Sequence, residues 1–228
     1  MTPTPQRPAV WVNCAVSLDG RLAFAGGTRA RLSSPEDLVR VQRLRAESDA
    51  ILVGVGTVIQ DDPSLRVHWE LIGGKAGPSP QRVIVDSTGR TPENARVLDG
   101  TTPTVLAVSR RSTRVFPGHV RTIVAGDSEV DLSEVFRDLY EHGVRRLMVE
   151  GGRAILGSVL RGGLFDRLTV YYAPAVIGGA TAPPMVGGEE TRAEGELLRL
   201  ETIGVERLGE GLLATFLPRR GDVLRPSG

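Results

Sequence analysis

Short apolar runs alternate with amphipathic stretches along the chain, which is the pattern of an α/β protein. The runs are rich in Val, Ile and Leu and are bounded by polar or Gly-containing segments, as in strands that are covered on both faces. Strands are accordingly predicted at 9–16, 50–53, 82–86, 104–108, 121–125, 146–150, 167–173 and 212–217. Because most of these runs are continuous rather than alternating, we expect a mainly parallel sheet.

Polar residues between these runs mark the starts of helices. Ser34 is a favoured N-cap residue, and the proline and acidic residues after it suit the first turn of a helix. Leu38, Val41 and Leu44 are spaced to form the buried face of this helix. Arg40 is expected to point mainly toward solvent. Two further helices are predicted, at 132–142 and 152–161.

One domain, spanning 9–218, accounts for these elements, because no linker divides the chain. Segment 1–8 is expected to be a disordered tail, and segment 219–228 is expected to be a C-terminal tail. A Gly/Pro-rich loop at 174–195 separates the last two predicted strands. No apolar run reaches the roughly 18 residues of a membrane span. The polar first residues lack the apolar region of a secretory signal, so a cytoplasmic protein is expected.

Charge and composition narrow the choice of ligands. Among 228 residues, 28 Lys and Arg nearly balance 27 Asp and Glu, for a formal net charge of +1. This balance predicts no general affinity for nucleic acid or an acidic membrane, but a small anionic ligand remains possible. The single cysteine, Cys14, lies in an apolar run and is predicted to be a buried thiol. The three histidines are far apart, so no metal site is predicted.

Three segments that follow predicted strands carry residues suited to a ligand, because ligands of open α/β sheets bind beyond the carboxyl ends of strands. They are Val-Gly-Val-Gly-Thr at 53–57, Asp-Ser-Thr-Gly-Arg at 86–90 and Glu-Gly-Gly-Arg at 150–153. Glycines let backbone N–H groups approach a phosphate, and Arg and small hydroxyls add donors. Each segment taken alone is also consistent with an ordinary tight turn.

Taken together, the motifs are more specific. The chain carries, in order, Ser-Leu-Asp-Gly-Arg at 17–21, Ser-Pro-Glu-Asp at 34–37, Arg-Ala-Glu-Ser-Asp-Ala-Ile-Leu-Val-Gly-Val-Gly-Thr at 45–57, Asp-Asp-Pro-Ser-Leu-Arg at 61–66, Val-Asp-Ser at 85–87 and Val-Glu-Gly-Gly at 149–152. Over nearly the whole chain this set resembles the pyrimidine reductases of riboflavin biosynthesis. The resemblance implies the dihydrofolate reductase-like α/β fold, a single domain whose mostly parallel central sheet is flanked by helices and has antiparallel C-terminal strands.

The resemblance also implies an oxidoreductase that uses NADPH, with NADH as an alternative, to reduce a phosphorylated ribosylamino-pyrimidine, and it implies a homodimer. Positions that match cofactor contacts in the family are Thr57, Asp61, Ser87, Thr88, Gly89, Arg90, Gly151, Gly152, Arg153, Ala154 and Ile155. Positions that match substrate contacts are Asn13, Arg45, Leu65, His68 and Glu150. Bacterial members often carry Arg at the position of His68, so a phosphate contact is expected to be weaker here.

Two pyrimidines are candidate substrates. The chain lacks the His-x-Glu and Pro-Cys-x-x-Cys motifs of the zinc deaminase to which bacterial reductases of this family are usually fused. It therefore resembles the stand-alone archaeal-type enzyme, which reduces 2,5-diamino-6-ribosylamino-4(3H)-pyrimidinone 5′-phosphate. Asn13 agrees with the diamino substrate. Bacterial members usually have Lys at this position, and Lys can only donate hydrogen bonds. Asn can also accept one, which suits a ring amine. The alternative substrate is the deaminated 5-amino-6-(5-phosphoribosylamino)uracil.

The resemblance leads to a mechanistic hypothesis. The ribosylamine ring opens to an imine, and the nicotinamide delivers hydride to C1′ while the protein positions the two carbons. Asp61 and Glu150 are the candidate catalytic carboxylates, and Arg45 is expected to clamp the 5′-phosphate. More distant alternatives are a pterin reductase of the same fold and a non-catalytic nucleotide binder.

Overall fold

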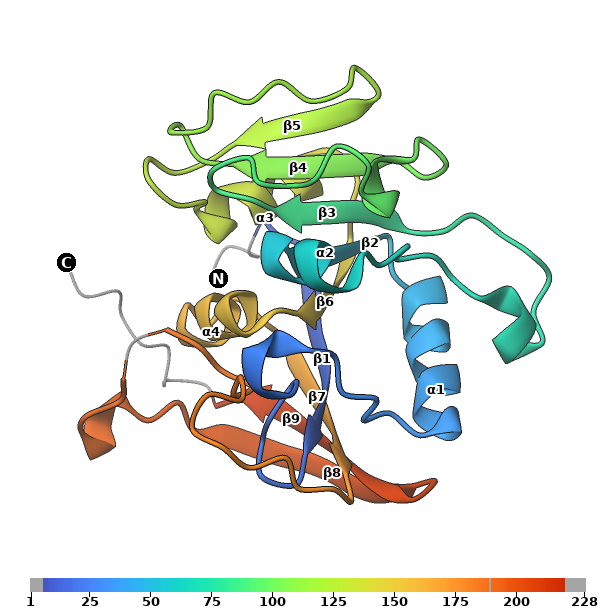
Figure 1. Ribbon diagram of the computed structural model, residues 1–228, viewed down its shortest axis with the longest axis vertical. Helices are drawn as coiled ribbons and strands as arrows, with labels where there is room; N and C mark the ends of the chain where they lie inside the picture. The colour runs from blue at the N-terminus through green and yellow to red at the C-terminus, as the bar shows by residue number, and fades with distance from the viewer. Residues whose placement is uncertain (1–5, 189, 220–228) are drawn as a thin grey trace, which may run out of the picture.

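The computed structural model describes residues 6–188 and 190–219. Nine strands form one sheet in the order β5-β4-β3-β2-β6-β1-β7-β9-β8, which runs from the top to the bottom of the molecule in Figure 1. They are β1 (Ala9–Ser17), β2 (Ala50–Gly54), β3 (Gln81–Val85), β4 (Thr104–Val108), β5 (Val120–Val124), β6 (Arg146–Gly151), β7 (Arg167–Ala173), β8 (Leu200–Leu208) and β9 (Gly211–Pro218). Every strand predicted from the apolar runs is confirmed.

The sheet is parallel except at its C-terminal edge. Strands β1 to β7 pair in parallel with one another, whereas β9 pairs antiparallel with β7, and β8 pairs antiparallel with β9. The predicted fold class is therefore confirmed. Strand β8 was not predicted, because its residues are exposed along nearly its whole length and form no apolar run. An antiparallel edge strand needs no such run, since water can cover it.

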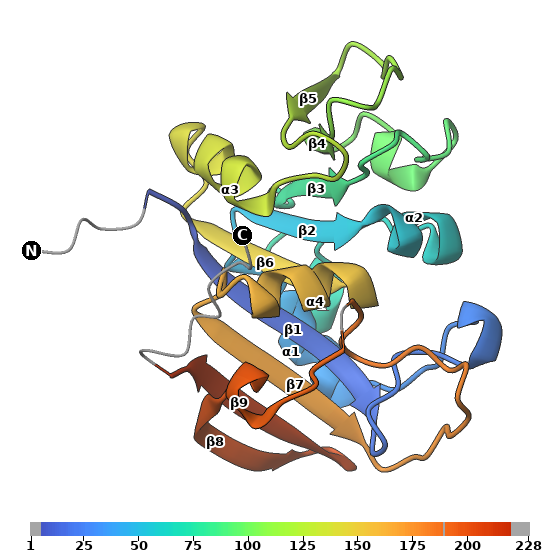
Figure 2. The ribbon, with the colours of Figure 1, turned by 90° about the vertical axis from the view of Figure 1, so that its left-hand side faces the viewer.

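Helices cover both faces of the sheet. In the described residues these are α1 (Pro35–Ala46), α2 (Val55–Asp61), α3 (Leu132–Glu141) and α4 (Arg153–Arg161), with short 3₁₀ turns η1 (Ala25–Gly27), η2 (Trp69–Ile72), η3 (Arg96–Leu98) and η4 (Glu194–Glu196). The apolar residues of α3 and α4 share a core with Val12, and those of α1 and α2 pack with Ile51 on the other face. Figure 2 shows α4 in front of the strands and α1 behind them. The predicted helices at 132–142 and 152–161 are confirmed as α3 and α4.

The first helix, α1, begins as predicted but buries a different face. Ser34 caps it by accepting a hydrogen bond from the backbone N–H of Asp37. Val41 and Leu44 pack against the core as expected. Leu38, however, is 44% exposed, whereas the Asp37 side chain is buried. The reason is that one side of α1 covers a polar part of the sheet, where hydrogen-bonding side chains take the place of apolar ones.

The Gly/Pro-rich loop at 174–195 is tied to the turn after β1 by Asp19. The Asp19 carboxylate accepts hydrogen bonds from the Ser17 hydroxyl at 2.7 Å and from the backbone N–H groups of Ile177 and Gly178 at 3.0 and 2.8 Å. The bond from Ser17, followed by the one from Ile177, lowers the pKa of Asp19 to about 2. The loop is therefore anchored through an exposed carboxylate that stays ionised far into the acid range.

Parts of the predicted tails lie outside the described residues, namely 1–5 and 220–228. Within the predicted N-terminal tail, the guanidinium of Arg7 forms an ion pair with Asp166 at 2.7 Å. The same carboxylate accepts a hydrogen bond from the backbone N–H of Val10 at the start of β1. Arg7 is therefore attached to the domain.

Candidate active site

Two glycine-containing turns lie side by side at the carboxyl ends of β2 and β6, which are neighbouring strands. Gly54 precedes α2, and Gly152 precedes α4. A Cβ on Gly54 would lie 2.8 Å from Cγ1 of Ile155, and a Cβ on Gly152 would lie 3.2 Å from Oγ1 of Thr57. Glycine suits both positions because the two turns are in close contact there. The contact brings the candidate residues Thr57, Gly152 and Ile155 together.

The turn at the end of β6 consists of two glycines, of which Gly151 is buried and Gly152 is partly exposed. Gly151 and Gly152 have φ angles of 128° and 86°, conformations that favour glycine. A Cβ on Gly151 would meet nothing within 4 Å, and the side chains of Arg153 and Ala154 in the first turn of α4 are exposed. The N–H groups of this first turn carry the positive end of the helix dipole. The open glycine cradle therefore fits the pyrophosphate of a dinucleotide cofactor.

The turn after β3 is organised by Asp86. The buried Asp86 carboxylate accepts hydrogen bonds from the backbone N–H of Arg90 at 2.9 Å and from the backbone N–H and hydroxyl of Thr91, each at 2.7 Å. Asp86 therefore closes the turn and is not available to a ligand. The side chains of Thr88 and Arg90 are exposed, so both can meet a cofactor.

The other two candidates in this turn, Ser87 and Gly89, are engaged with the protein. The Ser87 hydroxyl accepts a hydrogen bond from the backbone N–H of Val130 at 3.1 Å. Gly89 has a φ of 76°, and its carbonyl accepts a hydrogen bond from Nη1 of Arg114 at 2.8 Å. These contacts hold the turn in place beside β4, so both residues shape the position of Thr88 and Arg90.

Glu150 occupies a β-bulge and reaches across to α1. The pairing of β6 with β2 shifts register between Leu52 and Val53, which makes Glu150 the extra residue in β6. Its two carboxylate oxygens accept hydrogen bonds from Nε and Nη2 of Arg45, each at 2.6 Å. The side chains of Arg45 and Glu150 are only 14% and 13% exposed. This bidentate pair is therefore strong and largely shielded from water.

The guanidinium of Arg45, which is expected to clamp a phosphate, is largely committed to the protein. Its remaining nitrogen, Nη1, donates to the backbone carbonyl of Arg66 at 2.9 Å. Only the second N–H of each terminal nitrogen is left for a ligand. The Arg66 side chain is partly exposed and pairs with Asp99 at 2.8 Å. The role of Arg45 as a phosphate clamp stays a prediction, and Glu150 is its partner in the structure.

Leu65 directly precedes Arg66, whose carbonyl binds Arg45, and has a left-handed backbone conformation with φ of 51°. Such a conformation costs about 1–2 kcal/mol for a residue with a Cβ, so burial has to hold it in place. The Leu65 side chain is 1% exposed and packs with Val55 and Val58 of α2. Because this side chain fills the core, only the backbone of Leu65 can contact a substrate.

Asn13 belongs to a hydrogen-bonded network between β1 and α1. Its side chain is 7% exposed, and its Oδ1 accepts a hydrogen bond from Nη2 of Arg40 at 2.7 Å. Arg40 also donates from Nε and Nη2 to Oδ1 of Asp37, at 2.9 and 2.6 Å. The prediction that Arg40 points mainly toward solvent is wrong, because the buried oxygens of Asn13 and Asp37 require a donor.

The remaining candidates, Asp61 and His68, lie nearer the surface. At the end of α2, partial burial raises the pKa of Asp61, against the opposing effect of Arg29. This carboxyl group therefore keeps a proton to higher pH than a fully solvated one. His68 is bound through its backbone N–H to Gln42 at 2.9 Å, and its ring lies 2.9 Å from Glu70. The ring stays at the surface, since it is 51% exposed.

Sequence reasoning missed Asp37 and Arg40 as site residues. An acidic residue in the first turn of a helix with Arg three positions later is typical of an exposed ion pair. Nothing in that spacing shows that Asp37 is buried or that Arg40 reaches Asn13. The one available signal is that Asn13 is a polar residue inside an apolar strand, which requires a hydrogen-bond partner.

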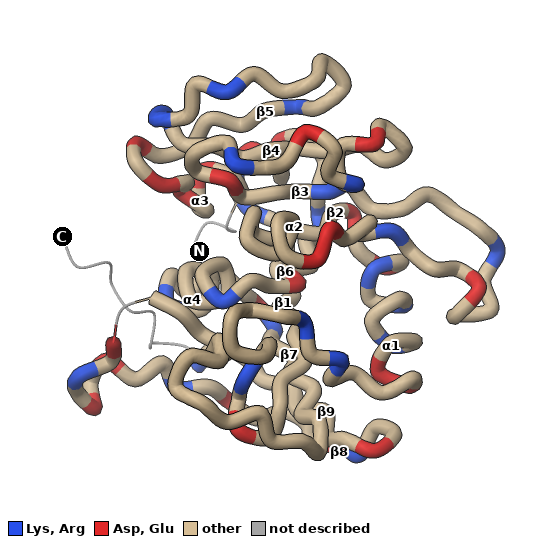
Figure 3. The backbone as a smooth tube through the Cα atoms, in the orientation of Figure 1, with Lys and Arg blue, Asp and Glu red and all other residues tan. Residues whose placement is uncertain are grey.

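Other features of the described residues add no second site. Basic and acidic residues are distributed over the whole chain (Figure 3). Within the described ranges, no three His, Cys, Asp or Glu side chains lie together as metal ligands, and no helix is long and apolar enough to cross a bilayer. Cys14 is buried as predicted, and burial raises the pKa of its thiol to about 12. The thiol is therefore neutral and unsuited to act as a nucleophile.

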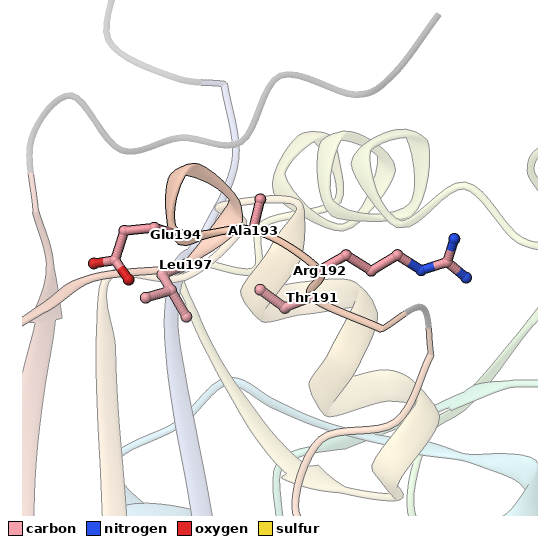
Figure 4. Close-up of a pocket in the computed structure, with 5 residues that line it drawn as sticks. All are labelled: Thr191, Arg192, Ala193, Glu194 and Leu197. Atoms are coloured by element: carbon pink, nitrogen blue, oxygen red, sulfur yellow. The ribbon is translucent and has the colours of Figure 1, made fainter.

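Figure 4 shows a hollow on the segment between β7 and β8. It is lined by Thr191, Arg192, Ala193, Glu194 and Leu197. All of these residues come from one short stretch of chain, and the charged ends of Arg192 and Glu194 point in opposite directions. None of the candidate residues lines this hollow, and its polar groups do not point toward a common position where a ligand would bind.

The fold and these contacts define an α/β protein with a candidate dinucleotide cradle at the carboxyl edge of a mostly parallel sheet. Residues 8–214 match the family described as the RibD C-terminal domain, and the chain belongs to this family. The family expected from the sequence motifs is thus confirmed.

Individual relatives agree with this assignment. The chain is 42% identical over 218 residues to the 2,5-diamino-6-ribosylamino-4(3H)-pyrimidinone 5′-phosphate reductase of Archaeoglobus fulgidus, covering 92% of this chain and 97% of the relative. It is 41% identical over 214 residues to the reductase of the same name from Methanothermobacter thermautotrophicus, covering 92% and 98%. The structure of Acinetobacter baumannii RibD superposes with a TM-score of 0.79 at 25% identity, and the match covers 93% of this chain and 58% of that chain.

Proposed function

We propose that this chain reduces the ribosylamino side chain of 2,5-diamino-6-ribosylamino-4(3H)-pyrimidinone 5′-phosphate to the ribitylamino form, with NADPH, in riboflavin biosynthesis. The observation that carries the proposal is the 42% identity, over nearly the full length of both chains, to a reductase named for this substrate. The structure supports it because the open glycine turn and the Arg45–Glu150 pair are contiguous along β6. The proposed cofactor site at the glycine turn is therefore next to the proposed substrate site at the Arg45–Glu150 pair.

The cofactor contacts are proposed to come from two turns. Gly151, Gly152 and the start of α4 at 153–155, where the side chains of Arg153 and Ala154 are exposed and that of Ile155 is buried, bind the pyrophosphate through backbone N–H groups. Thr57 lines the same turn. Thr88 and Arg90, exposed after β3, are the candidates for the adenosine end. Because Arg90 and Arg153 can bind a ribose 2′-phosphate, we propose NADPH rather than NADH. When bound, the cofactor supplies hydride to the substrate.

The substrate contacts are proposed to lie between α1 and the sheet. Asn13, Arg45 and Glu150 form the wall of this site, Leu65 contributes backbone groups, and His68 lies at the rim. Arg45 fixes both oxygens of Glu150, so that the carboxylate keeps one orientation toward the ribosylamine. A 5′-phosphate contact by Arg45 is limited to the N–H groups that do not face Glu150 or the Arg66 carbonyl.

The two candidate carboxyl groups are suited to different roles. Reduction of the open-chain imine adds a hydride at C1′ and a proton at the attached nitrogen. Because both oxygens of Glu150 are engaged by Arg45, whereas no such partner holds Asp61 in the described residues, we propose Asp61 as the proton carrier, and partial burial raises the pKa of Asp61 in the same sense. Glu150 is held by the Arg45 guanidinium as an acceptor, and we propose that it orients the hydroxyl or amine groups of the substrate.

One observation favours a second candidate, the deaminated pyrimidine. Oδ1 of Asn13 already accepts a hydrogen bond from Arg40, so the group that Asn13 has free is an N–H donor. A donor suits a ring carbonyl, whereas the sequence predicts that Asn13 accepts a hydrogen bond from a ring amine. The relatives named above favour the diamino substrate.

A steady-state assay separates the two candidates. Purified protein is mixed with NADPH and either pyrimidine, and oxidation is followed at the absorbance band of reduced nicotinamide. The proposal predicts faster oxidation with the diamino compound and a ribitylamino product in the mass spectrum. Preference for the deaminated compound would favour the second candidate, and no oxidation with either would contradict the proposed function.

A homodimer and a cytoplasmic location stay predictions. Light scattering tests the first, and cell fractionation tests the second.

A further inference from the structure

The network of Asn13, Arg40 and Asp37 has a defined hydrogen-bond direction. Arginine only donates, so the atom of Asn13 that faces Arg40 has to be the carboxamide oxygen. The 2.7 Å contact between Oδ1 and Nη2 of Arg40 therefore fixes which end of the carboxamide points at α1. Within the described chain, Nδ2 has no hydrogen-bond partner, and it is not one of the buried atoms sealed from solvent. Its partner has to come from solvent or a ligand.

Asp37 determines where the guanidinium of Arg40 lies. Asp37 is 1% exposed, and its Oδ1 accepts hydrogen bonds from both Nε and Nη2 of Arg40. The side chain of Arg40 is itself only 18% exposed. A buried carboxylate requires a partner charge, so the pair holds Arg40 in a single position over β1. The same Nη2 atom that binds Asp37 also binds Asn13.

We propose that Arg40, held by Asp37, is a positioning residue that locks the Asn13 carboxamide with its oxygen toward α1 and its Nδ2 toward the bound pyrimidine. The inference rests on the proposed function, since it takes a pyrimidine as the ligand facing Asn13. Asn13 then recognises a hydrogen-bond acceptor of the ring, either a carbonyl oxygen or an unprotonated ring nitrogen. Arg40 and Asp37 thereby influence the choice between pyrimidines without touching them.

The test compares Arg40→Gln with Arg40→Lys. Glutamine both donates and accepts, so it no longer dictates the orientation of Asn13, which is free to turn over. Lysine only donates, so it keeps the oxygen of Asn13 toward α1 and keeps a charge beside Asp37. The readout is the ratio of kcat/KM for the diamino and the deaminated pyrimidine. We expect Arg40→Gln to change this ratio about tenfold, as loss of one directed hydrogen bond does, and Arg40→Lys to preserve it.

Arg43→Gln is the matched control, because Arg43 is an exposed arginine on the same helix. It is expected to keep the wild-type ratio and the wild-type Kd for NADPH. A purely structural role of Arg40 would lower kcat/KM for both pyrimidines by the same factor, and that result, or no change at all, would overturn the inference. If Arg40→Gln does not fold, the double variant Asp37→Asn/Arg40→Gln removes both buried charges and carries the same expectation.

Failure of the proposed function has a different signature. Wild-type protein that oxidises NADPH with neither pyrimidine would contradict the proposed function and, with it, this inference. Wild-type protein that is active on either pyrimidine, but whose ratio does not move in Arg40→Gln, would contradict the inference alone.

Discussion

The two sides of the candidate site are built in different ways. At the carboxyl ends of β2 and β6, the proposed cofactor side consists of backbone. The residues that shape it are glycines, and replacing one with a residue that has a Cβ would strain the turn or fill its space. Under α1, the proposed substrate side consists of charged and amide side chains that contact one another across long sequence separations, Arg45 with Glu150 and Arg40 with Asn13. A glycine turn is encoded locally, whereas a paired side chain depends on the assembled fold. The two sides should therefore respond differently to substitution.

The largest effect is expected on the substrate side. Arg45→Met leaves Glu150 as a largely buried carboxylate without its partner, so we expect a loss of about 3 kcal/mol in the free energy of unfolding, measured by urea denaturation. The KM for the pyrimidine is expected to rise, because Glu150 loses its fixed orientation. The double variant Arg45→Met/Glu150→Gln should lose less stability than the single one. As a control, Arg110→Met breaks an exposed pair with Asp127 and should change stability by no more than about 0.5 kcal/mol. Equal losses for the single and double variants would contradict a buried charge pair.

On the cofactor side, Gly152→Ala should have the next largest effect. The residue has a φ of 86°, and the new Cβ would lie 3.2 Å from Oγ1 of Thr57. We expect a loss of about 1–2 kcal/mol in stability from backbone strain and a Kd for NADPH raised about tenfold, measured by fluorescence titration. Gly143→Ala is the matched control, since Gly143 also has a positive φ, of 93°, and a Cβ there meets nothing within 4 Å. Unchanged NADPH affinity in Gly152→Ala would remove this turn from the cofactor site.

Gly56→Ala is expected to raise the stability of the fold while it weakens NADPH binding. Gly56 lies within α2, has no positive φ, and a Cβ there would meet nothing within 4 Å. Alanine in a helix is favoured over glycine by up to about 1 kcal/mol, so thermal unfolding should shift upward. NADPH should nevertheless bind more weakly if the cofactor approaches this backbone. Greater stability together with unchanged binding would show that the cradle does not extend to α2.

The smallest effect is expected at the anchored loop and depends on pH. The pKa of Asp19 is lowered from 3.8 to about 2, so its ionised form stabilises the folded chain above about pH 4, and this contribution is lost as the pH falls toward about 2. The difference in Tm between wild type and Asp19→Asn should accordingly shrink over that range. Asp127→Asn, at an exposed position, is the reference variant for the general effect of removing a carboxylate. A constant difference across the range would contradict the anchoring role of Asp19.

The sequence was sufficient for the strands and for the glycine turns because both follow from local rules. Continuous apolar runs located every strand except β8, whose exposed edge position requires no such run. The site on the substrate side was only partly predictable. The motifs identified Asn13, Arg45 and Glu150 as candidates, but the predicted phosphate clamp did not reveal that Arg45 binds Glu150. The partners come from strands and helices far apart in sequence, and their pairing also depends on the β-bulge at Glu150.

The most direct test of the two-sided site is a pair of binding titrations on two variants. NADPH and the diamino pyrimidine are titrated separately into Gly152→Ala and Arg45→Met, with wild type as the reference. The account predicts that Gly152→Ala weakens NADPH binding and leaves pyrimidine binding near the wild-type value, and that Arg45→Met does the reverse. If both variants weakened both ligands equally, or if the two effects were exchanged, the assignment of the glycine turn to the cofactor and of the α1 side to the substrate would be contradicted.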